Sequence, residues 1–341
     1  MPLSLYVDGP RWRDHLTKTA DDNPGLIPVA KGNGYGLTVG RLARRAEWLG
    51  VDTIAVGTYP EVAEVVQRFS GDILVMEPWR PFSPGVSYGD RVIHTVGRRS
   101  DLAALPAAAG PGGSPRVLLE ALTSMRRHGF AADDLAQVGR SIRGLRVEGH
   151  AVHLPLGDGH VAEVERWLAA APARRWFASH LRHDELDELS RRHPDVEFRP
   201  RVGTALWLGD RGALQAMATV LDAHRVRRGE QVGYRQRRIG RDGTVLIVSG
   251  GTAHGVALVA PNAAASPRAR AAALAQGGLS ASGRALSPYL VDGKQRWFAE
   301  PPHMQVSMIF VPSGATCPDV GDEVKLQVRF TTTTFDRVVV S

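Results

Sequence analysis

The sequence predicts an α/β fold, a (β/α)8 TIM-like barrel followed by a mainly β C-terminal domain. Eight short apolar runs rich in β-branched residues begin about 20 to 30 residues apart, which is the length of one βα unit. After about residue 221 the helical periodicity is lost, and strand-like runs alternate with stretches rich in Gly, Pro, Ser and Ala. We therefore expect a barrel over residues 1–221, whose first few residues are free to pair with the β domain, and a β domain over residues 222–341.

The predicted barrel strands are Ile27–Lys31, Thr53–Gly57, Asp72–Met76, Arg91–Val96, Arg116–Ala121, Arg146–His153, Arg174–Ser179 and Val196–Arg201. Helical periodicity between them is clear in Gly40–Leu49 and Val161–Leu168. A doubly wound open sheet would show the same alternation, and the count of eight units favours a closed barrel. The predicted β-domain elements are the strands Gln231–Tyr234, Thr244–Ser249, Val256–Val259, Gln305–Val311, Glu323–Phe330 and Arg337–Val340, with one helix at Pro267–Leu274.

The composition excludes several classes of protein. The single cysteine, Cys317, excludes an internal disulfide and a cysteine-based metal cluster. No uncharged apolar stretch is long enough to span a membrane, and the N-terminus has no secretory signal. The 42 Lys and Arg residues outnumber the 35 Asp and Glu residues, but the excess is spread thinly and lacks the interleaved aromatics of a base-stacking surface. We expect a cytoplasmic protein that binds no metal, no membrane and no nucleic acid.

Lysine is rare in this arginine-rich chain, and one lysine stands where an amine has a chemical use. The lysines are Lys18, Lys31, Lys294 and Lys325. Lys31 closes the first predicted strand and precedes a glycine-rich turn, Gly32–Gly36. Burial at a strand end lowers the pKa of a lysine and frees its amine to attack an aldehyde, which guanidinium cannot do. The residues alone would equally permit an aldolase-type Schiff base.

Other polar residues also stand where predicted strands end. Arg127 follows the fifth strand, His153 closes the sixth and Ser179 closes the seventh. Arg201-Val202-Gly203-Thr204 follows the eighth. Barrels collect their functional groups at the carboxyl ends of the strands, and often bind phosphate after strands seven and eight. We therefore expect these residues to meet Lys31 at one face.

Five segments resemble motifs of the alanine racemases, which are fold-type III enzymes that use pyridoxal 5'-phosphate (PLP). Val29–Gly36 is similar to the family's Val-X-Lys-Ala-(Asn/Asp)-Ala-Tyr-Gly. The other four segments follow in the family's order: Thr123–Gly129, Val147–His153, Arg201–Gly209 and Gly229–Tyr234. The resemblance implies a PLP-bearing barrel, a C-terminal β domain and racemisation of a free amino acid.

The resemblance also implies a role for each matching residue. Lys31 would carry PLP and act on one face of the substrate Cα. Tyr234 would act on the opposite face and reach in from a second subunit, which implies a homodimer. The remaining roles are His153 beside the cofactor ring, Arg201 at the pyridine nitrogen, Tyr35, Ser179, Gly203 and Thr204 on the phosphate, and Arg127 and Met308 on the substrate.

The chemistry of racemisation agrees with these roles. Inversion at Cα needs a proton removed on one face and returned on the other, hence two groups. Cations such as His153 and Arg201 would stabilise the phenolate of Tyr234. An arginine at the pyridine nitrogen leaves that nitrogen unprotonated and weakens the ring as an electron sink, whereas the related decarboxylases place a carboxylate there. Arg201 therefore favours a racemase.

The sequence departs from the family in the substrate pocket. Glu120 stands where the family often has a modified lysine paired with the arginine, and an ion pair between Glu120 and Arg127 would replace it. Thr252, Ile309 and Phe335 stand where the family has a tyrosine, an aspartate and a tyrosine. We expect a substrate other than alanine. Two alternatives stay open: a decarboxylase or aldolase-type reaction on the same scaffold, and a PLP-binding homologue without catalysis.

Overall fold

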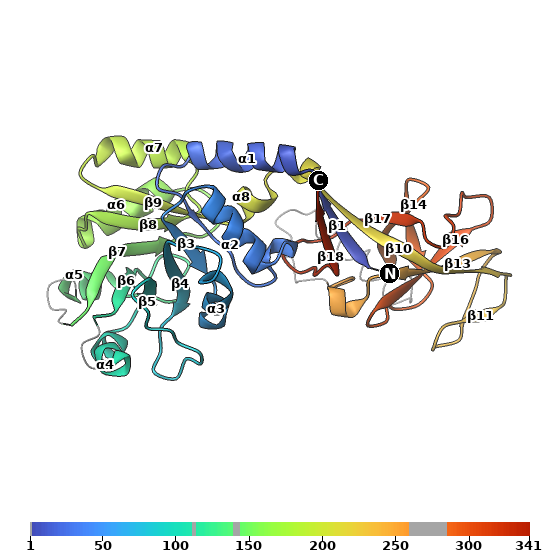
Figure 1. Cartoon of the computed structure of the whole chain (residues 1–341), viewed down its shortest axis with the longest axis horizontal. Helices are drawn as coiled ribbons and strands as arrows, with labels where there is room; N and C mark the ends of the chain where they lie inside the picture. Colours follow the sequence, from blue (N-terminus) through green and yellow to red (C-terminus); the bar gives the residue numbers. More distant parts are fainter. Residues whose placement is uncertain (1, 111–113, 139–143, 259–284) are drawn as a thin grey trace. The chain divides into compact units, whose positions relative to one another are not determined.

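The computed structural model describes residues 2–110, 114–138, 144–258 and 285–341 (Figure 1). The predicted helix Pro267–Leu274 lies outside the described residues. The chain divides into two compact units. The barrel unit consists of Arg13–Gly34 and Thr38–Gly209, and the β unit of Met1–Trp12, Tyr35–Leu37 and Asp210–Ser341. No helix in the described ranges combines the length and the apolar character needed to cross a bilayer.

Eight parallel strands form the barrel, in the spatial order β2-β9-β8-β7-β6-β5-β4-β3. They are β2 (Ile27–Pro28), β3 (Thr53–Val56), β4 (Asp72–Pro78), β5 (Val92–Val96), β6 (Arg116–Glu120), β7 (Arg146–His153), β8 (Arg175–Ser179) and β9 (Glu197–Val202). A bridge between Val29 and Ala55 joins the two ends of the sheet, where the amide of Ala30 donates to the carbonyl of Ala55 at 2.8 Å. The predicted (β/α)8 barrel and the β domain that follows it are confirmed.

Helices alternate with these strands, and Figure 1 shows α4 to α7 outside them. They are α1 (Gly9–Asp21), α2 (Val39–Trp48), α3 (Val62–Val65), α4 (Arg99–Ala109), α5 (Ala132–Val138), α6 (His160–Ala170), α7 (His183–Arg192) and α8 (Thr204–Leu208). The apolar spacing predicts which side each helix buries. In α2, Leu42, Ala43 and Ala46 are fully buried, whereas Arg41 and Arg44 are exposed.

A layer of apolar side chains fills the barrel interior, and most strands contribute one residue to it. Ile27, Val29, Ala55, Leu74, Ile93, Leu118, Ala151 and Phe177 form this buried cluster. Because side chains alternate across a strand, the residue two positions further on points to the same side of it. The next layer toward the carboxyl ends therefore begins directly above an apolar floor.

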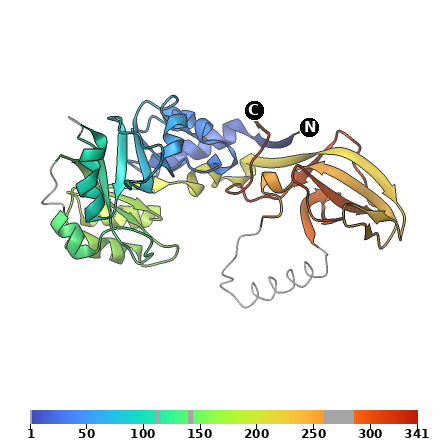
Figure 2. The same cartoon turned by 90° about the horizontal axis from the view of Figure 1, so that it is seen from below.

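The β unit contains a closed ring of antiparallel strands. The strands of the unit are β1 (Leu3–Val7), β10 (Leu214–Val226), β13 (Gly243–Ser249), β14 (Leu286–Val291), β15 (Lys294–Phe298), β16 (Val306–Pro312), β17 (Glu323–Leu326) and β18 (Arg337–Val340), with a short hairpin of β11 (Gln231–Val232) and β12 (Arg237–Arg238). The ring itself consists of β13, β16, β15, β14, β17 and β10. The long strand β10, yellow in Figure 2, pairs with β17 and, beyond an irregularity at Val220, with β13. The pairing with β13 closes the ring. β1 pairs with β10 and β18.

Several details of the β unit differ from the sequence prediction. Leu221, where the composition changes, lies within β10, so this strand crosses the predicted domain boundary. β14 and β15 were not predicted. The strand predicted at Val256–Val259 is wrong for its described residues, because the chain turns there and Ala257 has a φ of 65°. A positive φ interrupts the extended backbone that pairing requires.

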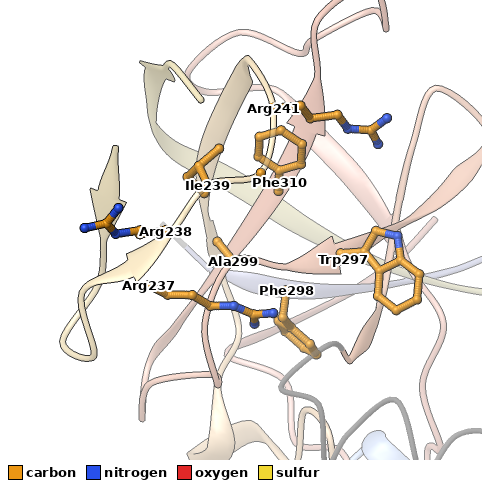
Figure 3. Close-up of a pocket in the computed structure, with 9 residues that line it drawn as sticks. Arg237, Arg238, Ile239, Arg241, Trp297, Phe298, Ala299 and Phe310 are labelled. Carbon is orange, nitrogen blue, oxygen red and sulfur yellow. The ribbon is translucent and has the colours of Figure 1, made fainter. Parts of the chain in front are cut away.

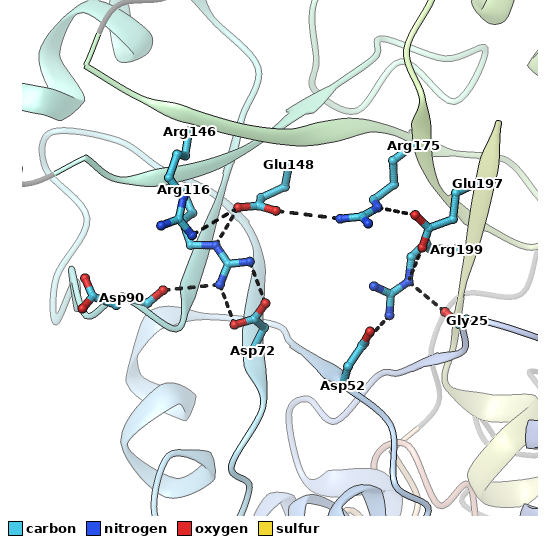
Figure 4. Close-up of polar contacts among 10 residues, drawn as sticks. All are labelled: Gly25, Asp52, Asp72, Asp90, Arg116, Arg146, Glu148, Arg175, Glu197 and Arg199. Carbon is cyan, nitrogen blue, oxygen red and sulfur yellow. Dashed lines mark hydrogen bonds and ion pairs between the residues drawn. The ribbon is translucent and has the colours of Figure 1, made fainter. Parts of the chain in front are cut away.

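An ion-pair network joins the amino ends of the barrel strands (Figure 4). Arg116 donates to both oxygens of Asp72 at 2.5 and 2.6 Å and to Glu148 at 2.6 Å. The network continues through Arg175 to Glu197, at 2.6 Å, and through Arg199 to Asp52. The guanidinium of Arg116 is only 12% exposed. Ion pairs therefore stabilise the amino ends of the barrel strands, and Lys31 lies at the opposite, carboxyl ends.

Replacing Arg116 should destabilise the barrel, because Asp72 and Glu148 would lose their shared counter-ion. We expect Arg116→Met to lower the free energy of unfolding by about 2–3 kcal/mol. The matched control is Arg99→Met, whose ion pair with Asp134 is half exposed on both sides and should contribute less than about 1 kcal/mol. Urea denaturation of the two variants measures the difference. Equal effects would show that the network does not stabilise the barrel.

Candidate active site

The next layer toward the carboxyl ends of the strands is a polar layer, interrupted only by Gly57 and Met76. By strand its residues are Lys31, Gly57, Met76, Thr95, Glu120, His153, Ser179 and Arg201. Three of them lie side by side, because His153 is opposite Ser179 and Ser179 is opposite Arg201 in the strand register. The structure thus brings together four of the residues singled out by the sequence, Lys31, His153, Ser179 and Arg201.

The turn after Lys31 is held by a carboxylate. Glu61 accepts from the amide of Gly32 at 2.6 Å and from the amide of Gly57 at 2.6 Å. It therefore ties the end of the first strand to the end of its neighbour. Gly34, with a φ of 62°, passes so close to α2 that a Cβ would lie 2.5 Å from the amide nitrogen of Val39. Only glycine fits this backbone, which explains the departure from alanine at that position.

The surroundings of Lys31 favour its neutral amine. Desolvation lowers the pKa of Lys31, and the nearby guanidinium groups of Arg127 and Arg201 lower it further. The carboxylate of Glu61 opposes this shift without reversing it. A larger fraction of the amine is consequently neutral near pH 7, which is the form that attacks a carbonyl carbon or removes a proton.

Arg201 is buried in the lumen beside Glu120. One amino group of Arg201 donates to the carbonyl of Val152 at 3.0 Å, and the other lies 3.8 Å from the carboxylate of Glu120. Both side chains are almost wholly buried. The Nε–H of Arg201 has no hydrogen-bond partner among the described residues. A buried donor without a partner costs free energy, so it marks a place where a ligand atom can bind.

The pairing of Glu120 differs from the sequence prediction. We expected an ion pair with Arg127, but within the described ranges the carboxylate is paired with Arg201. The pKa of Glu120 is raised by its burial, and the charges of Arg201 and Arg127 offset this shift only in part. The difference arises because the side chains of Glu120 on β6 and Arg201 on β9 are both buried in the lumen, whereas Arg127 lies on an exposed loop beyond β6.

Three imidazoles line the same region and are neutral near pH 7. Burial, followed by Arg201 and Arg127, lowers the pKa of His153 to about 3. Burial and Arg127 lower the pKa of His128 to about 4, and burial also lowers the pKa of His180. The ring of His180 meets His153 edge-on at 5.3 Å. His153 therefore does not supply the positive charge that we expected beside Tyr234.

The loop that carries Arg127 is fixed by two hydrogen bonds to α6. The amide and the hydroxyl of Ser124 each donate to the carboxylate of Glu163 at 2.6 Å. Thr123 also donates to the carbonyl of His153 at 2.6 Å. The exposed Arg127 is thereby held near the lumen, where it acts electrostatically on Lys31 and His153. Its planar guanidinium is suited to binding a carboxylate.

Gly203 and Thr204 follow β9 directly. Gly203 is the first cap residue of α8, and Thr204 is the first residue of that helix. The free amide groups at the start of a helix are donors for an anion. Ser179, buried at the end of β8, adds a hydroxyl from the neighbouring strand.

The other residues singled out by the sequence belong to the β unit. Tyr234 lies in the turn after β11 and is 85% exposed. Tyr35 is buried, and Met308 lies on β16 opposite Ile247. The remaining positions are structural: Ile309 belongs to the buried core of the unit, and the ring of Phe335 lies 6.1 Å from that of Phe330.

The β unit also has a hollow of about 360 Å³ that the sequence did not indicate (Figure 3). Its apolar floor includes Phe298 and Phe310. Figure 3 shows Arg237 extended toward Phe298, whereas Arg238 and Arg241 point outward. None of the residues that line it was assigned a role from the sequence.

Two groups of the barrel site escaped the sequence prediction. Glu61 has a local signal, because Thr58-X-X-Glu61 is the pattern of a helix capping box. The carboxylate in fact reaches the turn after Lys31, which the pattern does not reveal. Glu163 has no such signal, because its contact with Ser124 spans 39 residues.

Comparison with known proteins gives one family. Residues 12–189 match the family described as the alanine racemase N-terminal domain. The chain has the fold of the alanine racemase from Bartonella henselae with covalently bound pyridoxal phosphate, at 16% identity, with a TM-score of 0.74 over the whole of both chains. A histidine racemase from Leuconostoc mesenteroides subsp. sake has the same fold, at 15% identity and a TM-score of 0.70, over 100% of this chain and 98% of its own. No curated protein sequence matches.

Removing the charge of Arg127 should make Lys31 less reactive. Without that cation the pKa of Lys31 rises, so a smaller fraction of the amine is neutral at pH 7. We expect Arg127→Gln to slow trace acetylation of Lys31 by about two- to fivefold at that pH. The difference should vanish at a pH above the pKa of Lys31. Arg126→Gln, which changes the adjacent exposed residue, is the control, and peptide mass spectrometry measures both; equal rates in the two variants would contradict the assignment.

Proposed function

The chain belongs to the alanine racemase family, and from this premise we propose that it is a PLP-dependent racemase or epimerase of a free amino acid. One observation carries the proposal. The same polar layer contains a lysine of lowered pKa, Lys31, and a buried arginine, Arg201, whose Nε–H has no partner among the described residues. Lys31 and Tyr234 are the two catalytic groups of the proposed enzyme.

The residues present fit PLP. Lys31 offers an amine for the aldehyde, and the Nε–H of Arg201 offers a buried donor for the pyridine nitrogen. Ser179, Gly203 and Thr204 offer donors for the phosphate at the ends of the last two strands, and Tyr35 adds a phenol. No carboxylate other than that of Glu120 is paired with Arg201 among the described residues. When bound, PLP withdraws electrons from the substrate Cα and makes its hydrogen acidic.

Lys31 and Tyr234 divide the proton transfer between the two faces of Cα. The neutral amine of Lys31 removes the proton from one face, and the phenol of Tyr234 returns a proton to the other face. In the reverse direction the two groups exchange roles. Arg127 holds the substrate carboxylate, so that Cα stays aligned between them. His153, neutral near pH 7, would pack beside the cofactor ring without adding charge.

Arg201 selects racemisation over other reactions. A guanidinium does not give up its proton, so Arg201 would hold the pyridine nitrogen of bound PLP as a hydrogen-bond donor and would leave that nitrogen unprotonated. An unprotonated pyridine ring would be a weaker electron sink, which would disfavour decarboxylation and transamination. Glu120, at 3.8 Å, balances the buried charge of Arg201.

The substrate need not be alanine. The departures at Glu120, Thr252, Ile309 and Phe335 change the residues around the implied pocket, while Lys31, Arg201 and Tyr234 are retained. Relatives that share this fold are named for alanine and for histidine. A larger or more polar amino acid is therefore the substrate class that we propose. Met308 is its second contact after Arg127.

Exchange of the α-hydrogen in heavy water tests the proposed function. We expect PLP-loaded protein to exchange the α-hydrogen and invert the centre for at least one member of a panel of free amino acids. Proton NMR with chiral chromatography measures both events. Release of carbon dioxide or an aldehyde without inversion would select the other PLP reactions, and no exchange across the panel would contradict catalysis.

Mixing two inactive variants tests the proposed homodimer with shared sites. If Tyr234 serves the Lys31 of a second subunit, a heterodimer of Lys31→Ala and Tyr234→Phe contains one intact site. Random mixing at equal amounts should restore about a quarter of the wild-type rate, because half of the dimers are mixed and half of their sites are intact. Each variant alone should stay inactive. A mixture that remains inactive, although mass spectrometry detects the heterodimer, would contradict shared sites.

A further inference from the structure

Tyr234 has an aromatic neighbour within its own unit that the alanine racemase motifs do not contain. The phenol ring is largely exposed, and the imidazole of His303 packs against it with 4.7 Å between ring centroids and an interplanar angle of 43°. His303 lies in the segment between β15 and β16, 69 residues from Tyr234. The contact is therefore tertiary.

A buried carboxylate holds His303. Its Nε2 lies 2.5 Å from Oε1 of Glu300, whose side chain is only 2% exposed. A carboxylate accepts and cannot donate, so Nε2 carries the hydrogen and Nδ1 is left to bind a proton. A carboxylate partner also stabilises the imidazolium that such binding produces.

The backbone around this pair is shaped to hold it. Gly233 passes so close to Glu300 that a Cβ would lie 2.1 Å from its carboxylate, and its φ is 73°. Only glycine fits directly before Tyr234. The amide of His303 donates to Val306 at 2.9 Å, and its carbonyl accepts from Thr252 at 2.8 Å. Thr252 is one of the positions where the chain departs from its family.

The proposed reaction needs a positive charge beside Tyr234. When the phenol gives its proton to Cα, the O–H bond breaks, a Cα–H bond forms and a phenolate remains. His153 is neutral near pH 7, and Arg201 is already paired with Glu120. His303 is the imidazole that touches Tyr234, and with 26% of its side chain exposed it can exchange protons with water.

We propose that His303, oriented by Glu300, is a positioning residue that fixes the ring of Tyr234 and balances the charge of its phenolate as an imidazolium. The proposal rests on the proposed racemase function and adds a tyrosine–histidine–glutamate group to it. As the phenolate forms, the imidazole of His303 takes a proton from water. In the reverse direction the phenolate takes a proton from Cα and becomes a phenol, and the imidazolium returns its proton to water. No oxidant or further reactant is needed.

Chemical rescue of the PLP-loaded His303→Ala variant tests the proposal. We expect its racemisation rate to fall by about 100-fold, the range that a positioned acid–base group supplies. Added imidazole should restore much of the rate, whereas thiazole, which has a similar shape but stays unprotonated at pH 7, should not. The enantiomer whose α-hydrogen faces Lys31 should still exchange it in heavy water at the wild-type rate. The control, His224→Ala, removes an exposed histidine paired with Asp222 and should change nothing.

A fluorine label supplies a readout that does not depend on turnover. With 3-fluorotyrosine at position 234, the 19F signal of His303→Ala should move toward the wild-type position when imidazole or thiazole fills the space. If both molecules shift the signal and neither restores the rate, or if His303→Ala keeps the wild-type rate, the proposal is overturned. Loss of exchange for both enantiomers would show that His303 only supports folding. If the wild type exchanges the α-hydrogen of no amino acid, the proposed function itself is overturned. This outcome is distinct from failure of the His303 proposal, because the unmutated protein is then inactive as well.

Discussion

Closure of the barrel at the strand that carries Lys31 is the constraint on which the rest of the structure depends. On one side the amide of Val29 donates to Val202, and on the other the amide of Ala30 donates to Ala55. The first strand is thereby held between the eighth and the second strand in chain order. Lys31 follows directly, so its amine is fixed above the apolar floor, in the layer that also contains Arg201.

The charges of that layer explain its chemistry. Cationic groups at Arg127 and Arg201 act on Lys31 and on the imidazoles, and the carboxylates of Glu61 and Glu120 offset them only in part. Burial is the main reason why the pKa values of the amine and the imidazoles are lowered, and the surplus of positive charge lowers them further. The same surplus suits an anionic ligand. A cofactor with a phosphate and a substrate with a carboxylate are ligands of this kind. The β unit, in contrast, pairs His303 with Glu300 beside Tyr234.

The barrel could be predicted from the sequence because each strand is a short β-branched run, and its functional side chains follow from strand ends. The alternation of side chains along a strand was enough to predict the positions of Lys31, His153, Ser179 and Arg201. Side-chain contacts between residues far apart in the sequence could not be predicted. Arg201 pairs with Glu120 across the lumen, and His303 reaches Tyr234 from another segment. The strand β10 was not predicted, and the expected domain boundary falls inside it, because its Ala-containing sequence lacks a continuous β-branched pattern.

The attachment of PLP to Lys31 is the most direct test. The protein is loaded with PLP, reduced with borohydride and digested, and the peptides are mapped by mass spectrometry. A single modified peptide containing Lys31 is the predicted result, and it should disappear in Lys31→Arg. A label on Lys18, Lys294 or Lys325 instead, or no label after loading, would contradict the proposed site.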